Sequence, residues 1–230
     1  MQKKIFQTLL FFLLVMFLSQ MYLLAQNKKK EEALQALKTK QFSAAIKICL
    51  KELRESPGDY KFNFILAQAY AFSDQWDKAD KIISDILKNN PKNIDVLLLK
   101  ARLHAWEKNY SEAKDGFKYI LSLDENNKQA LTGLADTARW QGNLKQAEDI
   151  YLKIREQYPK SSEIYYKLGL LYKNIGDYAK ARKYLIEAVA ISPNKIDYKE
   201  ALKNINPKFK DTFEIRYQHN IQSFNDNRKA

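Results

Sequence analysis

The chain has 230 residues, enough for one or two domains with a buried core, and a formal net charge of +12. Its six Gly and five Pro leave little room for turn-rich all-β architecture, whereas abundant Lys, Glu, Ala and Leu favour helix. The lysines are interleaved with Asp and Glu, which argues against a nucleic-acid footprint, and the single Cys49 excludes an internal disulfide or multi-cysteine metal site.

The N-terminal residues have the pattern of an export signal. Lys3 and Lys4 give a positive start, and an uncharged apolar run follows over residues 9–18. The small residue Ala25 is a candidate for the position before the cleavage point. We therefore expect a signal peptide over residues 1–25.

An uncleaved membrane anchor is the alternative for this segment. Leu23 is larger than the residue usually found two places before Ala25, and residues 5–25 are just long enough to span a bilayer. With either outcome the remainder of the chain is exported or tethered to the membrane. The expected location is the periplasm or the outer membrane.

The rest of the chain repeats at an interval of 34 residues. One column contains only alanine: Ala45, Ala79, Ala113, Ala147 and Ala181. A second column contains only small residues: Ala33, Ala67, Ala101, Ala135 and Gly169. A third column contains large, mostly aromatic residues: Phe42, Trp76, Tyr110, Leu144 and Tyr178. Prolines at Pro57, Pro91, Pro159 and Pro193 keep the same register.

Each interval contains two predicted helices. In the last interval, apolar residues at helical spacing predict helices over residues 163–174 and 178–191, separated by a glycine turn. Pro193 ends the second helix because proline cannot continue one. The small Gly169 and Ala181 allow the two helices to approach closely.

These residues resemble the pattern of the tetratricopeptide-repeat (TPR) family. The matching residues are Leu168, Gly169, Tyr172, Gly176, Asp177, Tyr178, Ala181, Ala188 and Pro193. The resemblance implies an all-α, right-handed TPR solenoid of about five helix-turn-helix repeats. We place them at residues 26–59, 60–93, 94–127, 128–161 and 162–195. Repeats one and three depart from the pattern, because Glu32 and Lys100 replace its leucine.

The sequence changes character after the last repeat. A capping helix with a polar outer face is predicted over residues 196–206, because a solenoid must cover its last apolar face. In the tail at residues 207–230, alternating residues predict one amphipathic strand over residues 213–221. It is either a tail strand without partners or, by weak resemblance, the start of a truncated YaiO-like outer-membrane β-barrel.

An aromatic ladder is the main candidate for a binding site. Phe72, Trp106 and Trp140 are one interval apart, near the ends of the predicted first helices. In the TPR family, first helices line a concave groove where partners bind, and the resemblance adds further groove candidates: Phe64, Leu98, Arg102, Arg139, Tyr166 and Lys173. Aromatic rings beside arginine suit a peptide or sugar site, whereas the alternative is that the rings pack at the hairpin turns.

We expect a scaffold and not an enzyme. His104 and His219 lie in different kinds of structure, and no motif for a phosphate loop, a metal site or a nucleophile is present, so no catalytic residue, metal or cofactor is expected. The groove residues that grip acidic chaperone tails in some TPR proteins are absent. The predicted function is therefore protein binding in the cell envelope, with glycan binding in polysaccharide export or surface assembly as the alternative.

Overall fold

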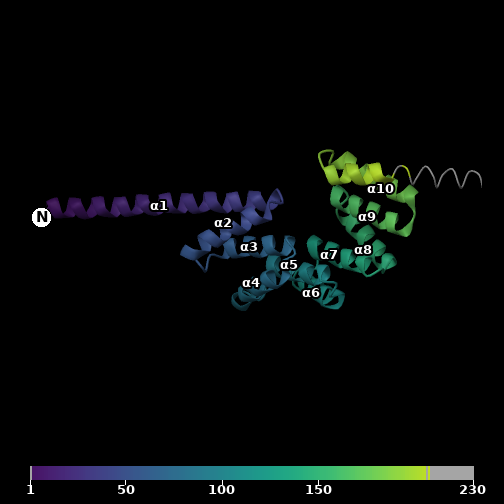
Figure 1. Ribbon diagram of the computed structural model, residues 1–230, viewed down its shortest axis with the longest axis horizontal. Helices are drawn as coiled ribbons and strands as arrows, with labels where there is room; N and C mark the ends of the chain where they lie inside the picture. The colour runs from purple at the N-terminus through teal and green to yellow at the C-terminus, as the bar shows by residue number, and fades with distance from the viewer. Residues whose placement is uncertain (1, 206, 208–230) are drawn as a thin grey trace, which may run out of the picture. The chain divides into compact units, whose positions relative to one another are not determined.

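The computed structural model describes residues 2–205 and 207, with side chains from residue 13 onward, and contains no strand within that part. Figure 1 shows the helices in chain order. They are α1 (Gln2–Lys38), α2 (Phe42–Glu55), α3 (Tyr60–Phe72), α4 (Trp76–Asn89), α5 (Ile94–Trp106), α6 (Tyr110–Leu123), α7 (Lys128–Trp140), α8 (Leu144–Gln157), α9 (Ser162–Ile175) and α10 (Tyr178–Ile191). A further helix covers residues 196–205. The predicted strand and the YaiO-like barrel segment lie outside the described residues.

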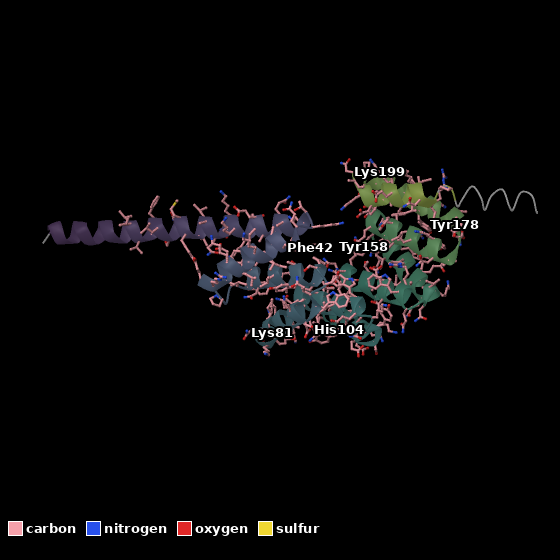
Figure 2. All side chains as sticks on the ribbon, in the orientation of Figure 1. Phe42, Lys81, His104, Tyr158, Tyr178 and Lys199 are labelled. Carbon is pink, nitrogen blue, oxygen red and sulfur yellow. The ribbon has the colours of Figure 1, made fainter. Side chains whose placement is uncertain are left out.

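The sequence interval sets where the helices begin. Helices α2, α4, α6, α8 and α10 have 14 residues each and begin at the third column of the sequence pattern. Phe42 and Tyr178, the first and last members of that column, are labelled in Figure 2. In sequence order the helices alternate between a first helix (α1, α3, α5, α7, α9) and a second helix. First helix packs on second in α1–α2, α3–α4, α7–α8 and α9–α10.

The turns between first and second helices share one backbone conformation. Their left-handed residues are 34 apart: Lys40 (φ 60°), Asp74 (φ 59°), Lys108 (φ 65°), Gly142 (φ 87°) and Gly176 (φ 85°). Glycine adopts this conformation without a steric penalty, whereas other residues do so at a cost. The repeat therefore imposes the turn geometry even where the sequence lacks glycine.

Small residues let the helices approach as the pattern predicted. The five members of the alanine column, Ala45, Ala79, Ala113, Ala147 and Ala181, are all 0% exposed. A Cβ atom on Gly169 would lie 2.6 Å from Leu185 Cγ and 3.4 Å from the Ala181 carbonyl oxygen. This confirms the role predicted for Gly169, since no larger residue fits there without displacing Leu185.

The chain divides into two compact units, Met1–Leu103 and His104–Ala230, with the boundary inside α5. In the first unit, Phe62 and Ile83 are fully buried. In the second unit, one apolar cluster extends from α7 to the helix over residues 196–205, where Ile205 is fully buried. That last helix covers the apolar side of α9, which is the role predicted for a cap.

Helix α1 has two contrasting parts. Residues 13–25 are all exposed, and the N-terminal part of the helix extends away from α2 and α3 in Figure 1. Gln26 is the first buried residue, and Ala33 and Ala36 are then buried. Among the described residues, no helix combines the length and the apolar composition needed to cross a membrane.

Candidate partner-binding surface

A hollow of about 420 Å³ lies between the first helices α1 and α3 of the first unit. Phe64, one of the predicted groove residues, lies in its wall and stacks on Tyr60, with the ring centroids 6.0 Å apart. The remaining lining residues are Asn27, Lys30, Glu31, Leu34, Lys61 and Ile65. The wall therefore combines apolar and aromatic residues with three charged ones, Lys30, Glu31 and Lys61.

A second hollow, of about 540 Å³, lies in the second unit beside α9 and the helix over residues 196–205. Tyr166, another predicted groove residue, stacks on Tyr198 with the ring centroids 4.5 Å apart. The other lining residues are Lys128, Lys160, Ser161, Ser162, Glu163, Lys167, Lys195 and Asp197. Tyr166 follows Phe64 by three intervals of 34 residues, so the two residues belong to the same repeat column. Phe64 lines its hollow together with the preceding first helix, whereas Tyr166 does so together with the helix that follows.

Polar contacts fix the wall of this second hollow. The ammonium group of Lys128 donates a hydrogen bond to Ser161 Oγ (2.6 Å) and lies 3.9 Å from Glu163 Oε2. It also lies 5.6 Å from the ring centroid of Tyr158, which Figure 2 labels. Burial raises the pKa values of Tyr166 and Tyr198, so both phenols remain neutral hydrogen-bond donors at physiological pH.

Asp136 of α7 is the centre of a buried polar network in the second unit. Its side chain accepts hydrogen bonds from the Tyr151 hydroxyl (2.5 Å) and the Lys167 ammonium (2.5 Å). The Arg139 guanidinium lies 3.9 Å from the same carboxylate. Burial, followed by the charge of Asp136, raises the pKa of Tyr151, which keeps this phenol protonated. The network therefore joins the first helices α7 and α9 to the second helix α8.

Two buried polar atoms near this network have no hydrogen-bond partner within the described residues: Thr132 Oγ1 and Arg139 Nε. Thr132 is 6% exposed and belongs to the same repeat column as Phe64 and Tyr166. Buried polar groups are usually satisfied, so these two atoms are exceptions, and both are too buried to contact a bound molecule directly.

The aromatic ladder combines packing with exposure. Phe72 is 40% exposed, and its ring centroid lies 6.0 Å from that of Phe42 at the preceding hairpin turn. Trp140 is 41% exposed, and the Arg139 guanidinium lies 5.7 Å from its ring centroid. Trp106 is partly buried. The rings thus have features of both alternatives, packing at the turn and an accessible face.

The other predicted groove residues differ in how much surface they offer. Leu98 is 3% exposed, so its side chain offers little surface to a ligand. Arg102 is partly buried, and Lys173 is exposed near the end of α9. The structure brings Arg139 together with Trp140, and it places Phe64 and Tyr166 in separate hollows, one in each unit.

Sequence reasoning missed Asp136, Lys167 and the contact of Tyr198 with Tyr166. The interval itself contained one signal, because Asp136 follows the predicted Arg102 by 34 residues. Lys167 had no such signal, since an exposed lysine on a helix is the usual solvated residue. Lys167 belongs to the network because it donates to the Asp136 carboxylate of a different helix, a contact that only the structure reveals.

Cys49 and the acidic residues show no arrangement for metal binding or nucleophilic chemistry. Cys49 is fully buried, and burial raises the pKa of its thiol to about 12, so it stays protonated at neutral pH. In the part of the chain that the structure describes, no cluster of three or more His, Cys, Asp or Glu side chains could hold a metal ion.

Two family models, both described as tetratricopeptide repeat, match residues 36–103 and 128–194. Among solved structures, a thermophilic TPR protein of Thermus thermophilus has a TM-score of 0.71 and 14% identity, covering 78% of this chain and 97% of that one. YrrB, described as a TPR protein with an unusual peptide-binding site, has a TM-score of 0.50 and 18% identity, covering 76% and 90%. At these identities the structural likeness establishes the fold alone.

One curated relative is the photosystem I assembly protein Ycf3 of Prochlorococcus marinus (strain MIT 9312). It is 44% identical over 50 residues, which are 22% of this chain and 29% of Ycf3. The match therefore spans less than a third of that protein and corresponds in size to one or two repeats.

Proposed function

Because this chain is a tetratricopeptide-repeat protein, whose fold typically serves as a non-catalytic interaction scaffold, we propose that it holds a segment of another protein against its first helices. An extended or helical segment is bound in this way by repeat proteins that present a row of helices. YrrB, with its peptide-binding site, supports the same assignment by similarity of fold.

The observation that supports this proposal most strongly is the pair of hollows on the first helices. Phe64 and Tyr166 occupy equivalent repeat positions, and each lines a hollow of several hundred Å³. An aromatic ring supplies a large contact area at a small cost in side-chain entropy, so it is a frequent anchor for a partner's side chain. Neighbouring lysines and hydroxyl groups supply the polar contacts that orient a peptide.

Glycan binding is the second candidate, and one observation favours it. The accessible ring of Trp140, with Arg139 beside it, is a surface on which a sugar ring could stack. A peptide side chain can use the same surface. The two candidates therefore have to be separated by the chemical nature of the captured molecule.

Site-specific photo-cross-linking in the native cell tests the proposal. Phe64 and Tyr166 are replaced, one at a time, by benzoylphenylalanine, which reacts on illumination with whatever lies against it. Matched controls carry the same group at Leu50 and Tyr119, which are 44% exposed on the second helices α2 and α6. Protease-sensitive adducts at positions 64 or 166 and not at the controls are expected. Adducts digested only by glycosidases, or none at all, would contradict a protein-binding role.

We also propose that the chain is exported and works in the cell envelope. The apolar run and the lysines before it support a signal peptide, and the contrast within α1 agrees, since residues 13–25 are exposed and burial begins at Gln26. A fusion of residues 1–26 to alkaline phosphatase, which is active only outside the cytoplasm, tests this. Replacing Leu13 and Phe17 with Arg should abolish the activity; an inactive parent fusion would refute export.

The proposal that these repeats are the periplasmic part of an outer-membrane protein rests on the alternating sequence of residues 213–221. Sequencing the coding region beyond the codon for Ala230 tests it. Further alternating segments of about ten residues would support a barrel, and a stop codon would end this part of the proposal.

A further inference from the structure

We propose that the hollow beside Tyr166 binds an acidic segment of the partner polypeptide, an inference that rests on the proposed scaffold function. The hollow is the one lined by α9 and the helix over residues 196–205, and it lies wholly within the second unit. The following observations concern its charge, its hydrogen-bonding groups and its aromatic faces.

The first observation is the charge of the lining. Four lysines and two carboxylates line the hollow. Lys128 and Lys167 are held in the wall by Glu163 and Asp136, at 3.9 Å and 2.5 Å. The other two lysines, Lys160 and Lys195, are exposed, as are the carboxylates of Glu163 and Asp197. The lining as a whole carries two more positive than negative charges, and this excess attracts a carboxylate.

The second observation is the set of hydrogen-bond donors inside. Ser161 Oγ accepts from the Lys128 ammonium, so its own hydroxyl proton is directed to another acceptor. The phenols of Tyr166 and Tyr198 are protonated at neutral pH, since the ordinary pKa of tyrosine is already about 10 and burial raises the pKa values of both further, so each can donate to a carboxylate. Hydrogen bonds from fixed donors to an ionised acceptor are stronger than those between neutral groups.

The third observation favours a polypeptide over a compact polyanion. Glu163 and Asp197 lie in the same lining, and they repel the two charges concentrated on one phosphate more strongly than the single charge of one side-chain carboxylate. The same carboxylates can accept hydrogen bonds from backbone N–H groups that flank an acidic side chain. The stacked rings of Tyr166 and Tyr198 offer an apolar face to a neighbouring side chain. An acidic peptide satisfies all of these groups at once.

The hollow of the first unit provides an internal contrast. Leu34, Phe64 and Ile65 form much of its wall, and its charged groups are Lys30, Lys61 and Glu31. Lys30 is already paired with Asp59 at 2.8 Å. This hollow therefore suits an apolar side chain, and the preference for an acidic segment is confined to the second unit.

Calorimetric titration of the full chain with two peptides tests the proposal. The probes are acetyl-Glu-Tyr-Glu-Glu-amide and the same peptide with Gln at each Glu. The acidic peptide should bind about tenfold more tightly at low salt, and the advantage should shrink as added salt screens the charges. Equal binding of the two peptides would overturn the acidic preference.

Matched variants locate the binding. Lys160→Gln with Lys195→Gln should weaken the acidic peptide about five- to tenfold, because two exposed attractive charges are lost. Lys153→Gln with Lys183→Gln, a control pair of exposed lysines on α8 and α10, should leave it unchanged. Equal effects of the two pairs would refute this location. Tyr166→Phe keeps the ring and should retain more binding than Tyr166→Ala.

Further measurements distinguish an acidic peptide from other anions, and they test this inference independently of the proposed scaffold function. The first probes are pentagalacturonate and inorganic phosphate. If either binds more tightly than the acidic peptide and depends equally on Lys160 and Lys195, the ligand of this hollow is an acidic sugar or a phosphate and the proposal of an acidic peptide is wrong. Protein adducts at position 166 without any affinity for the acidic peptide would overturn this inference and leave the scaffold function intact. Absence of both would remove the two together.

Discussion

The two hollows differ in chemistry and in the helices that form them, since the first lies between α1 and α3 and the second beside α9 and the helix over residues 196–205. Leu34, Phe64 and Ile65 line the first, whereas four lysines and two carboxylates line the second. The alanines that set the distance between helices are the same in both units and equally buried. The repeat therefore fixes how the helices pack, while the side chains that face each hollow set what it binds.

The largest effect is expected from Asp136→Ala, which leaves Lys167 and the Tyr151 hydroxyl without their acceptor. Because these groups are mostly but not fully buried, the loss should be about 2–3 kcal/mol in the free energy of unfolding, below the cost of a fully buried pair. Urea unfolding followed by circular dichroism measures it. A loss below about 0.5 kcal/mol would mean that the network is not structural.

A matched variant carries the comparison further. Asp136→Leu with Lys167→Ile and Tyr151→Phe gives the second unit the apolar residues that Leu34 and Ile65 provide three intervals earlier, and it removes the orphaned hydroxyl. It should recover part of the stability lost in Asp136→Ala, because replacing Asp136 together with its two hydrogen-bond donors is less costly than removing the acceptor alone, although Arg139 still loses its carboxylate.

The next effect concerns the close approach of α6 and α7. A Cβ atom on Gly133 would lie 2.3 Å from two ring carbons of the buried Phe117. Gly133→Ala should therefore cost about 1–2 kcal/mol, since overpacking outweighs the gain in helix propensity. Gly58→Ala in the first unit is the control, because nothing lies within 4 Å of its Cβ position. Equal melting temperatures for the two variants would contradict the packing described.

A smaller effect of opposite sign is expected at the hairpin turns. Lys40 of the first unit has φ 60°, where the second unit has Gly142 with φ 87°. Lys40→Gly should raise the free energy of unfolding by about 0.5–1 kcal/mol, and Gly142→Ala should lower it by a similar amount. Thermal unfolding checks both, and a destabilised Lys40→Gly would show that the lysine side chain, not its backbone, matters there.

The smallest effect is a dependence on pH. The Tyr172 hydroxyl, which donates to Glu148, is the main reason that the pKa of this carboxyl lies below its usual range. A lowered pKa in the folded state adds stability above about pH 4 that is lost as the pH falls through the folded value. Tyr172→Phe should therefore reduce the loss of stability between pH 5 and pH 3 by less than about 1 kcal/mol.

The first unit has its own acid-sensitive carboxyl for comparison. Burial alone would raise the pKa of Asp59, but hydrogen bonds from Lys30 and the Phe62 N–H, with the Lys30 charge, outweigh burial and lower it. Its contribution is lost over the same acid range and should be unaffected by Tyr172→Phe. Urea midpoints at pH 7, 5 and 3 measure both; an unchanged profile in Tyr172→Phe would remove Glu148 from the account.

Much of the fold could be predicted because its determinants are local and periodic. The third column marks the first residue of five second helices, and the alanine column marks their buried contacts. Phe72, Trp106 and Trp140 are the last residues of α3, α5 and α7. The division into two units inside α5 had no such signal, because the pattern continues through it without a break.

The candidate site was less accessible to sequence reasoning. The interval directed attention to the column of Phe64 and Tyr166, and both residues line hollows, while their role in binding stays a prediction. It did not distinguish Leu98, which belongs to the same column but is buried. Burial at a repeat position depends on the neighbouring side chains, and those vary from one repeat to the next. Lys167 and Tyr198 likewise became part of the site only through contacts with other helices.

A competition experiment tests most directly whether two hollows of different chemistry hold the partner. The full chain with benzoylphenylalanine at position 64 or position 166 is cross-linked to its partner with and without acetyl-Glu-Tyr-Glu-Glu-amide. The account predicts that the peptide suppresses the adduct at position 166 and spares the adduct at position 64. Equal suppression at both positions, or at neither, would contradict it.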